Sequence, residues 1–165
     1  MWAIIKIDKK KISQLQNDFR DKLGKDYEIY NPEFLIQKYK NNKLINKKFS
    51  LLGDYFFCFH EDFKKIETLN KIKFCRGLKY VLSGFIQSQK EIKIFIERCK
   101  SSENNLGYLS NNFYKLHTKS KYKFNSGPFV EKIFQIINLQ KNKIDILMGN
   151  IKTSINKQKF LFKPI

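Results

Sequence analysis

Several residue types that build common kinds of site are scarce in this chain. Its 165 residues include 3 cysteines, 7 glycines and 3 prolines. Cys58, Cys75 and Cys99 are odd in number and lack zinc-ligand spacing, so we expect neither a disulfide framework nor a metal site. A reducing cytoplasm fits this cysteine usage best. The sequence also lacks a glycine-rich phosphate loop, and we expect no cofactor.

Long apolar runs are absent as well. No segment reaches the length needed to cross a bilayer. In the opening MWAIIKIDKKK, the basic cluster follows a very short apolar run, which is the wrong order for a signal peptide or a membrane anchor. We therefore expect a cytoplasmic protein with no membrane partner.

Acidic residues are few in relation to basic ones. The 33 lysines and arginines outnumber the 15 aspartates and glutamates and give a formal charge of +18. An excess of this size implies a polyanionic partner, most simply nucleic acid. The alternative cause is the lysine-, asparagine- and isoleucine-rich composition of an AT-biased genome. With 42% hydrophobic and 15% aromatic residues, the chain has enough apolar material for a packed core.

The segment 49–62, FSLLGDYFFCFHED, carries a run of bulky residues directly after a glycine-aspartate turn. Large side chains at consecutive positions are typical of a central strand that is covered on both faces. Tyr55, Phe57 and Phe59 share one face of such a strand, whereas Phe56 and Cys58 share the other. One face can then pack on helices while the other remains for a partner.

Hydrophobic periodicity and turn residues predict an α+β sandwich in the first hundred residues, with helices packed on an antiparallel sheet. Its expected elements are a strand over 2–7, a helix from 10 that ends at Gly24, an extended segment over 27–30, a hairpin of 34–40 and 44–49, the central strand, a short helix over 63–69, a strand over 78–82, and a helix after the capping box of Ser88 and Glu91. The hairpin lysines are expected to be solvated, and they are Lys38, Lys40, Lys43, Lys47 and Lys48.

The remaining residues differ in character. Residues 101–116 are rich in serine, asparagine and glycine and lack periodicity, which predicts a linker. Short β-prone segments then follow between frequent turns, as in a small barrel; they span 121–124, 133–138, 143–148, 151–155 and 159–162. We therefore expect an N-terminal domain over 1–100, a linker over 101–116 and a β-barrel over 117–165.

Motifs in this order resemble those of the NusG family of transcription elongation factors. LLGDYFFCF at 51–59 is similar to the family's Phe-Pro-Gly-Tyr-hydrophobic-Phe-Val segment, and Arg76-Gly77-Leu78 is similar to its Arg/Pro-Gly-Val element. Gly127-Pro128-Phe129 is similar to the turn that opens the family's KOW barrel, and the layout looks most like that of the specialised RfaH-type paralogues. The resemblance implies an NGN-type sandwich joined by a linker to a C-terminal KOW β-barrel.

For function, the resemblance implies a non-enzymatic factor that suppresses transcriptional pausing or termination. Its N-terminal domain would bind the clamp helices of the largest catalytic subunit of RNA polymerase through Leu52, Tyr55 and Phe57. A helix laid into an apolar groove needs a few large desolvated anchors, which aromatic residues supply well. The alternative is that these side chains only fill the sheet core.

The resemblance also places the segment after the central strand near the non-template DNA strand of the transcription bubble. Lysine and arginine bind the phosphates of exposed single strands in a salt-sensitive manner. Arg76 has a planar fork that can bind a phosphate or a base edge bidentately. The alternative is a solvated basic surface. The candidate nucleic-acid-binding residues are Lys64, Lys65, Lys71, Lys73 and Arg76, and Lys9 to Lys11 could extend this patch.

The barrel departs from the family pattern at two turns. The KOW glycine falls at Phe134, and the family's Phe-Gly-Arg turn reads Met148-Gly149-Asn150. The resemblance implies that Leu147, Met148 and Gly149 contact the barrel's partner, for which the small-subunit ribosomal protein NusE is the candidate. The departures argue against the termination factor Rho and favour a divergent paralogue.

Two other functions are weaker hypotheses. His60, Glu61 and Asp62 look like a metal or acid/base cluster, but no nucleophile or third ligand accompanies them. Asp62 is better explained as the N-cap of the next helix, and His117 as a surface residue. The other hypothesis is a KOW-type RNA-binding or ribosome-associated protein, which would not need an exposed apolar patch on the N-terminal domain.

Overall fold

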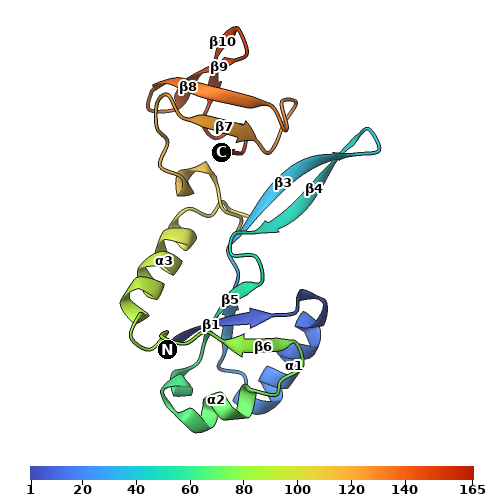
Figure 1. The fold of residues 1–165 in the computed structure, drawn as a ribbon, viewed down its shortest axis with the longest axis vertical. Helices are drawn as coiled ribbons and strands as arrows, with labels where there is room; N and C mark the ends of the chain where they lie inside the picture. The colour runs from blue at the N-terminus through green and yellow to red at the C-terminus, as the bar shows by residue number, and fades with distance from the viewer. The chain divides into compact units, whose positions relative to one another are not determined.

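The computed structural model describes residues 1–165, and Figure 1 traces its elements. It is a mixed α/β structure with three α-helices and β-sheets of four, five and two strands. The chain divides into two compact units, one of Met1–Pro32 with Ser50–Arg98 and the other of Glu33–Phe49 with Cys99–Ile165. The hairpin of the expected N-terminal domain thus groups with the second unit. None of the helices combines the length and apolar character that a membrane span requires.

The first unit is built on a four-stranded antiparallel sheet. Its strands are β1 (Trp2–Ile7), β2 (Glu28–Tyr30), β5 (Tyr55–Phe59) and β6 (Leu78–Val81), in the order β2-β5-β1-β6. β5 lies inside the sheet, between β2 and β1, so the prediction of a central strand is confirmed.

The register of β1 against β5 divides their side chains between two apolar faces. Ala3 pairs with Cys58 and Ile5 with Phe56, and all four side chains are buried on one face. The opposite face carries the pairs Trp2–Phe59, Ile4–Phe57 and Lys6–Tyr55. Since neighbouring residues of a strand alternate between faces, this division is the one that the sequence predicts.

Helices cover both faces of this sheet. A 3-10 turn, η1 (Lys9–Lys11), has Asp8 as its N-cap and leads into α1 (Ile12–Leu23). The C-cap of α1 is Gly24, at φ 82°. α1 contacts α2 (Ile66–Ile72), and both lie on one side of the sheet in Figure 1. α3 (Gln89–Ser101) lies against the other side, where the Phe95 ring is 5.8 Å from the Phe57 ring.

The predicted capping role of Asp62 is wrong. A 3-10 turn, η2 (Glu61–Lys64), precedes α2, and Asp62 lies inside it. The N-cap of η2 is His60, whose Nδ1 accepts the Asp62 N–H at 3.1 Å. The Asp62 carboxylate instead pairs with Lys65 Nζ at 2.7 Å. The extra turn moves the start of α2 to Ile66, beyond the reach of an Asp62 cap.

The second unit contains a hairpin of β3 (Glu33–Lys40) and β4 (Lys43–Ser50), together with a five-stranded antiparallel sheet in the order β10-β9-β8-β7-β11. The sheet strands are β7 (Lys121–Phe124), β8 (Ile133–Leu139), β9 (Lys143–Met148), β10 (Ile151–Asn156) and β11 (Phe162–Pro164). Four of these strands lie where the sequence predicts them. The fifth begins at Phe162 rather than at 159, because Asn156 Oδ1 accepts the Gln158 N–H at 2.9 Å and holds residues 157–159 in a turn.

The expected linker, residues 101–116, contains hydrogen-bonded structure in place of an irregular chain. Ser110 caps a 3-10 turn, η3 (Asn111–Phe113). Asn111 is buried, its Nδ2 donates to the carbonyls of Lys157 and Phe160, and its Oδ1 accepts the Phe162 N–H. The amide of one side chain therefore ties this segment to the last strand of the chain.

The turn before β6 provides a stability test. Gly77 has φ 87°, and a Cβ added there would lie 2.9 Å from both the Cβ and the carbonyl oxygen of Lys11. Gly84 has a similar φ of 80° with nothing within 4 Å of an added Cβ. Gly84→Ala should lower the free energy of unfolding by about 1–2 kcal/mol, the cost of a left-handed residue. Gly77→Ala should cost at least about 1 kcal/mol more, because the neighbour it meets includes backbone. Urea denaturation of both variants measures the difference, and equal losses would contradict the close approach.

Candidate functional site

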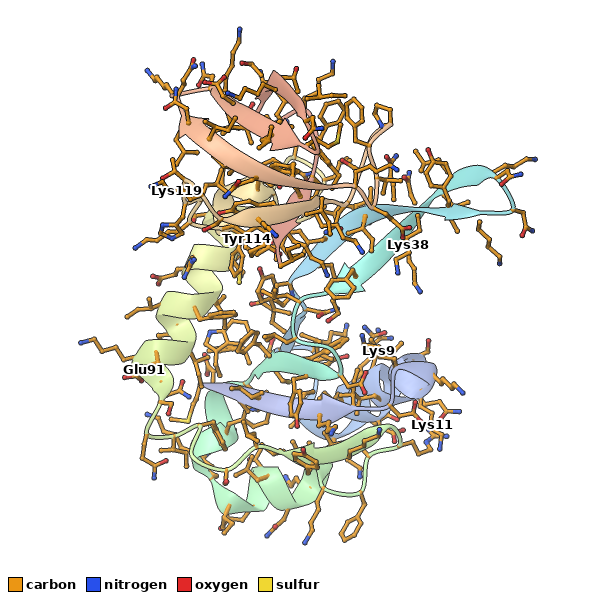
Figure 2. The ribbon with its side chains drawn as sticks, turned by 45° about the horizontal axis from the view of Figure 1, so that its top comes forward. Lys9, Lys11, Lys38, Glu91, Tyr114 and Lys119 are labelled. Atoms are coloured by element: carbon orange, nitrogen blue, oxygen red, sulfur yellow. The ribbon has the colours of Figure 1, made fainter.

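A shallow apolar groove of about 570 Å³ opens between α3 and the sheet of the first unit. Strands β1 and β5 supply its floor, and the first two turns of α3 supply one wall. Figure 2 labels Glu91, which lies on this part of α3. The residues that line the groove are Ile4, Leu52, Tyr55, Phe57, Leu82, Ser88, Glu91, Ile92 and Phe95.

The three predicted polymerase-binding residues all line this groove. Leu52 and Tyr55 are half-buried and contribute accessible side chains. Phe57 is only 3% exposed and packs among the rings of Trp2, Tyr30 and Phe95. Phe57 therefore forms the floor of the groove, and its truncation would disturb the core as well as the groove.

Two residues that complete the groove escaped the sequence prediction of the site. Leu82, just after β6, is 37% exposed, and Phe95 on α3 is half-buried. The helical face of Ile92 and Phe95 is visible in the sequence as apolar spacing. That pattern predicts only that this face of α3 is buried. It does not predict that α3 covers the sheet incompletely and leaves an open apolar surface.

Polar groups mark the Tyr55 end of the groove. The Tyr55 and Tyr80 hydroxyls are 2.8 Å apart, and Lys6 Nζ lies 5.1 Å from the Tyr55 ring and 5.6 Å from the Tyr80 ring. The hydrogen bond with Tyr80 lowers the pKa of Tyr55. The same two tyrosines raise the pKa of Lys6, so this amine remains charged. An apolar floor with a charged edge suits an amphipathic protein segment.

The predicted nucleic-acid-binding residues lie in and around α2, and all are exposed. Lys65 is engaged with Asp62, and this hydrogen bond raises the pKa of Lys65. Lys64, Lys71 and Lys73 form no ion pair. Three exposed lysine amines outside any ion pair therefore lie along 64–73, a segment that also carries Glu67.

Arg76 has a structural partner that the sequence prediction did not include. Its Nε and Nη2 both donate to the Asp18 carboxylate, with Nη2 at 2.6 Å from Oδ1, and its backbone N–H donates to Oδ2 at 2.7 Å. This bidentate pair joins the turn before β6 to α1. The fork that could bind a phosphate is therefore largely engaged, and only the outer guanidinium N–H groups remain for another ligand.

Phe74 is a further candidate that the sequence prediction missed. Its side chain is 81% exposed, and Lys73 Nζ lies 5.9 Å from the ring centroid. An exposed aromatic ring among lysines is what a stacking platform for single-stranded bases requires. A phenylalanine that follows two lysines alternating with an apolar residue, in KIKFCRG, is the signal that could have identified it.

His60 has a structural role. Its Nδ1 accepts the Asp62 N–H, so the proton lies on Nε2, which donates to the Leu23 carbonyl at 3.2 Å. Both ring nitrogens are thus used in joining η2 to the end of α1. The predicted surface position of His117 is confirmed.

The predicted barrel residues lie together at one turn. Leu147 and Met148 end β9 and are half-buried, and Gly149 is exposed at φ 59° in the turn to β10. Met148 pairs with Ile151, which is strongly exposed. The turn therefore presents accessible apolar side chains beside a glycine.

The Asp18–Arg76 pair predicts a pH dependence. Hydrogen bonds from Arg76 lower the Asp18 pKa from 3.8 to about 2. A depressed carboxyl pKa stabilises the fold above the unfolded-state pKa, and this stabilisation is lost as the pH falls from about 4 towards 2. In Arg76→Ala, the Asp18 pKa should rise from about 2 towards its ordinary value of 3.8 without reaching it, because the backbone N–H of residue 76 still donates to Oδ2. Unfolding stability should therefore fall less steeply over that interval. Carboxyl NMR titration measures the change. Lys65→Ala is the control, and it should shift the pKa of Asp62 but not that of Asp18. If Asp18 in the wild-type protein titrated near its ordinary pKa, the ion pair with Arg76 would be contradicted.

Comparisons with known proteins complete the description of the site. No protein-family model matches the chain, and a search of curated proteins found no match. Among solved structures, the chain is similar to the MjSpt4:Spt5 complex in conformation B, with 14% identity over 100% of this chain and 99% of that chain and a TM-score of 0.32. It is also similar to Thermotoga maritima NusG, with 14% identity over 99% of this chain and 96% of that chain and a TM-score of 0.31.

Proposed function

We propose that this protein is a NusG-like transcription elongation factor of the RfaH type, which binds RNA polymerase and suppresses pausing or termination. The observation that carries the proposal is the groove of the first unit. Leu52, Tyr55 and Phe57, selected by their motif, line one continuous apolar surface together with α3. The clamp helices of the largest polymerase subunit are its proposed occupant.

The form of the groove suits a helical partner. Its floor is a sheet face that is rich in aromatic side chains, and its wall is a helix, so a second helix laid alongside α3 would bury apolar side chains on two sides. Leu52, Tyr55 and Leu82 are accessible enough to be desolvated on binding. Large anchors in the centre of an interface dominate binding energy.

The groove also favours this function over the RNA-binding alternative. A KOW-type RNA-binding or ribosome-associated protein needs basic surface but no exposed apolar surface on its N-terminal part. The first unit has such an exposed apolar surface, the groove, and its exposure to water is unfavourable without a partner. Polymerase binding accounts for this surface, whereas RNA binding does not.

The basic segment 64–76 is the proposed site for the non-template DNA strand. Lys64, Lys71 and Lys73 would bind phosphates, and Phe74 would stack on a base. Lys65 and Arg76 would contribute less than the sequence suggested, because Asp62 and Asp18 engage them. The proposal therefore moves the centre of this site from Arg76 to Phe74.

The five-stranded sheet of the second unit is proposed to be the KOW barrel. Its turn of Leu147, Met148 and Gly149 would bind the small-subunit ribosomal protein NusE and so connect transcription with the ribosome. The exposed Ile151 beside this turn adds apolar area to the proposed interface.

Polymerase retention tests the groove. Leu82→Asp places a charge at the edge of the groove without removing a core side chain, and it should reduce retention of RNA polymerase in a pull-down by at least about tenfold, since hot-spot losses exceed about 2 kcal/mol. Ile94→Asp is the matched control, because Ile94 is also exposed on the first unit but does not line the groove. Equal retention by both variants would refute docking through this groove.

Single-stranded DNA binding tests the basic segment. Phe74→Ala should weaken binding of a fluorescent oligothymidylate by about 1–3 kcal/mol, the contribution of one stacked base. Ile66→Ala is the control, since it removes an apolar side chain that is also strongly exposed but cannot stack. Fluorescence anisotropy measures both affinities. Unchanged binding by Phe74→Ala, or the same loss in both variants, would exclude a stacking role.

A further inference from the structure

The β3–β4 hairpin carries a concentration of positive charge that the proposed polymerase and single-strand sites do not use. Residues 34–49 include five lysines and no aspartate or glutamate. From position 38 to position 49 every residue is exposed, so the outer part of both strands is free of the core. Figure 1 shows the hairpin as a twisted two-stranded ribbon.

The register of the hairpin places four of these lysines on one face. Asn41 and Asn42 form the turn, with φ 51° and 57°, as in a two-residue turn of type I′. Gln37 Nε2 donates to Asn46 Oδ1 at 3.1 Å, which puts these two residues opposite each other on the same face. Because neighbours alternate, the other face carries Ile45 together with four lysines. These are Lys38, Lys40, Lys43 and Lys47.

The base of the hairpin is held firmly within the second unit. Phe34 and Ile36 are buried, and the Phe34 ring stacks on Tyr114 with centroids 5.5 Å apart. The Gln37 backbone N–H donates to the Asn125 carbonyl, and Gln37 Oε1 accepts the Gly127 N–H, both at 2.7 Å. The lysine face begins at Lys38, which Figure 2 labels, immediately beyond this anchor. The lysines therefore lie on a rigid support.

The arrangement of the lysines is unfavourable for the free protein. The two-residue turn sets Lys40 opposite Lys43, and like charges directly opposite each other across a strand pair are destabilising. The repulsion between the two amines is reduced when anions lie between them. A ligand that presents closely spaced negative charges would relieve this repulsion.

We propose that this lysine face of the β3–β4 hairpin binds double-stranded DNA, as a second nucleic-acid site separate from segment 64–76. A two-stranded β-ribbon fits the major groove of B-DNA, which is about 12 Å wide. Lysine amines on the ribbon then reach the phosphates on both sides of the groove. The contacts are electrostatic and do not depend on base sequence.

The composition of the face favours a duplex over a single strand. Binding of single strands relies on aromatic rings on which bases stack. Between positions 38 and 47 the lysine face has no aromatic residue, because Tyr39 lies on the opposite face beside Gln37 and Asn46. Phe49 shares the lysine face but lies at the base of the hairpin, where Lys163 Nζ is 5.8 Å from its ring centroid. The four lysine amines act as compact point charges and offer no ring for a base to stack on. They therefore suit a duplex, in which the spacing of the phosphates is already fixed.

The test uses the full chain and fluorescent probes of one random sequence, a DNA duplex and its single strand. A variant with Lys38, Lys40, Lys43 and Lys47 all changed to Gln should bind the duplex at least about tenfold more weakly at low salt. The negative slope of log K against log salt should become shallower by about 3 to 4, since each phosphate contact contributes about 0.9 to its magnitude. Single-strand binding should remain within about twofold.

The matched control changes four exposed lysines of the five-stranded sheet and its adjoining loops to Gln, which removes the same net charge; they are Lys119, Lys132, Lys141 and Lys152. A duplex loss below tenfold in the hairpin variant, an equal loss in the control variant, or an equal loss with the single strand would each overturn the proposal. Thermal melting checks that each variant is folded. The double variant Lys40→Gln/Lys43→Gln repeats the test at the tip of the hairpin alone, and it should show half the change in the slope of log K against log salt. Because naked DNA is the ligand, the result is independent of polymerase binding.

Discussion

Burial of both faces of β5 is the constraint on which the first unit depends. Phe56 and Cys58 lie in the core on one face, where burial raises the pKa of the Cys58 thiol to about 12 and keeps it neutral. Phe57 lies on the other face and is almost as well buried. A strand with aromatic residues at consecutive positions requires a second apolar layer, since each exposed ring would forfeit about 1.5–3 kcal/mol of transfer free energy.

The second layer is incomplete, and its incompleteness creates the proposed site. α3 covers Phe57 through Phe95 but leaves Leu52, Tyr55 and Leu82 accessible along one side. The same strand thus stabilises the fold and forms the floor of the groove. Charge is arranged separately, at segment 64–76 and on the lysine face of the hairpin, so apolar docking and phosphate binding would use different surfaces.

The sequence predicted what depends on local patterns. The alternation of β5, the hairpin of β3 and β4 and most strands follow from residue type and spacing, and they are confirmed. The sequence could not predict contacts between distant residues: Asp18 and Arg76 are 58 positions apart, and nothing near either residue indicates the pair. For the same reason Arg76 looked free, and the open side of the groove at Leu82 was not foreseen. The error at Asp62 is local, because the 3-10 turn η2, capped by His60, precedes α2.

The central claim is that the groove holds helices of RNA polymerase, and site-specific photocrosslinking in the native cell tests it most directly. A benzoylphenylalanine at position 82 would lie at the edge of the groove, and one at position 94 would lie outside it. We predict that the crosslink from position 82 maps by mass spectrometry to the clamp helices of the largest polymerase subunit, with little product from position 94. Crosslinks from position 82 to ribosomal proteins alone, or equal polymerase products from both positions, would contradict it.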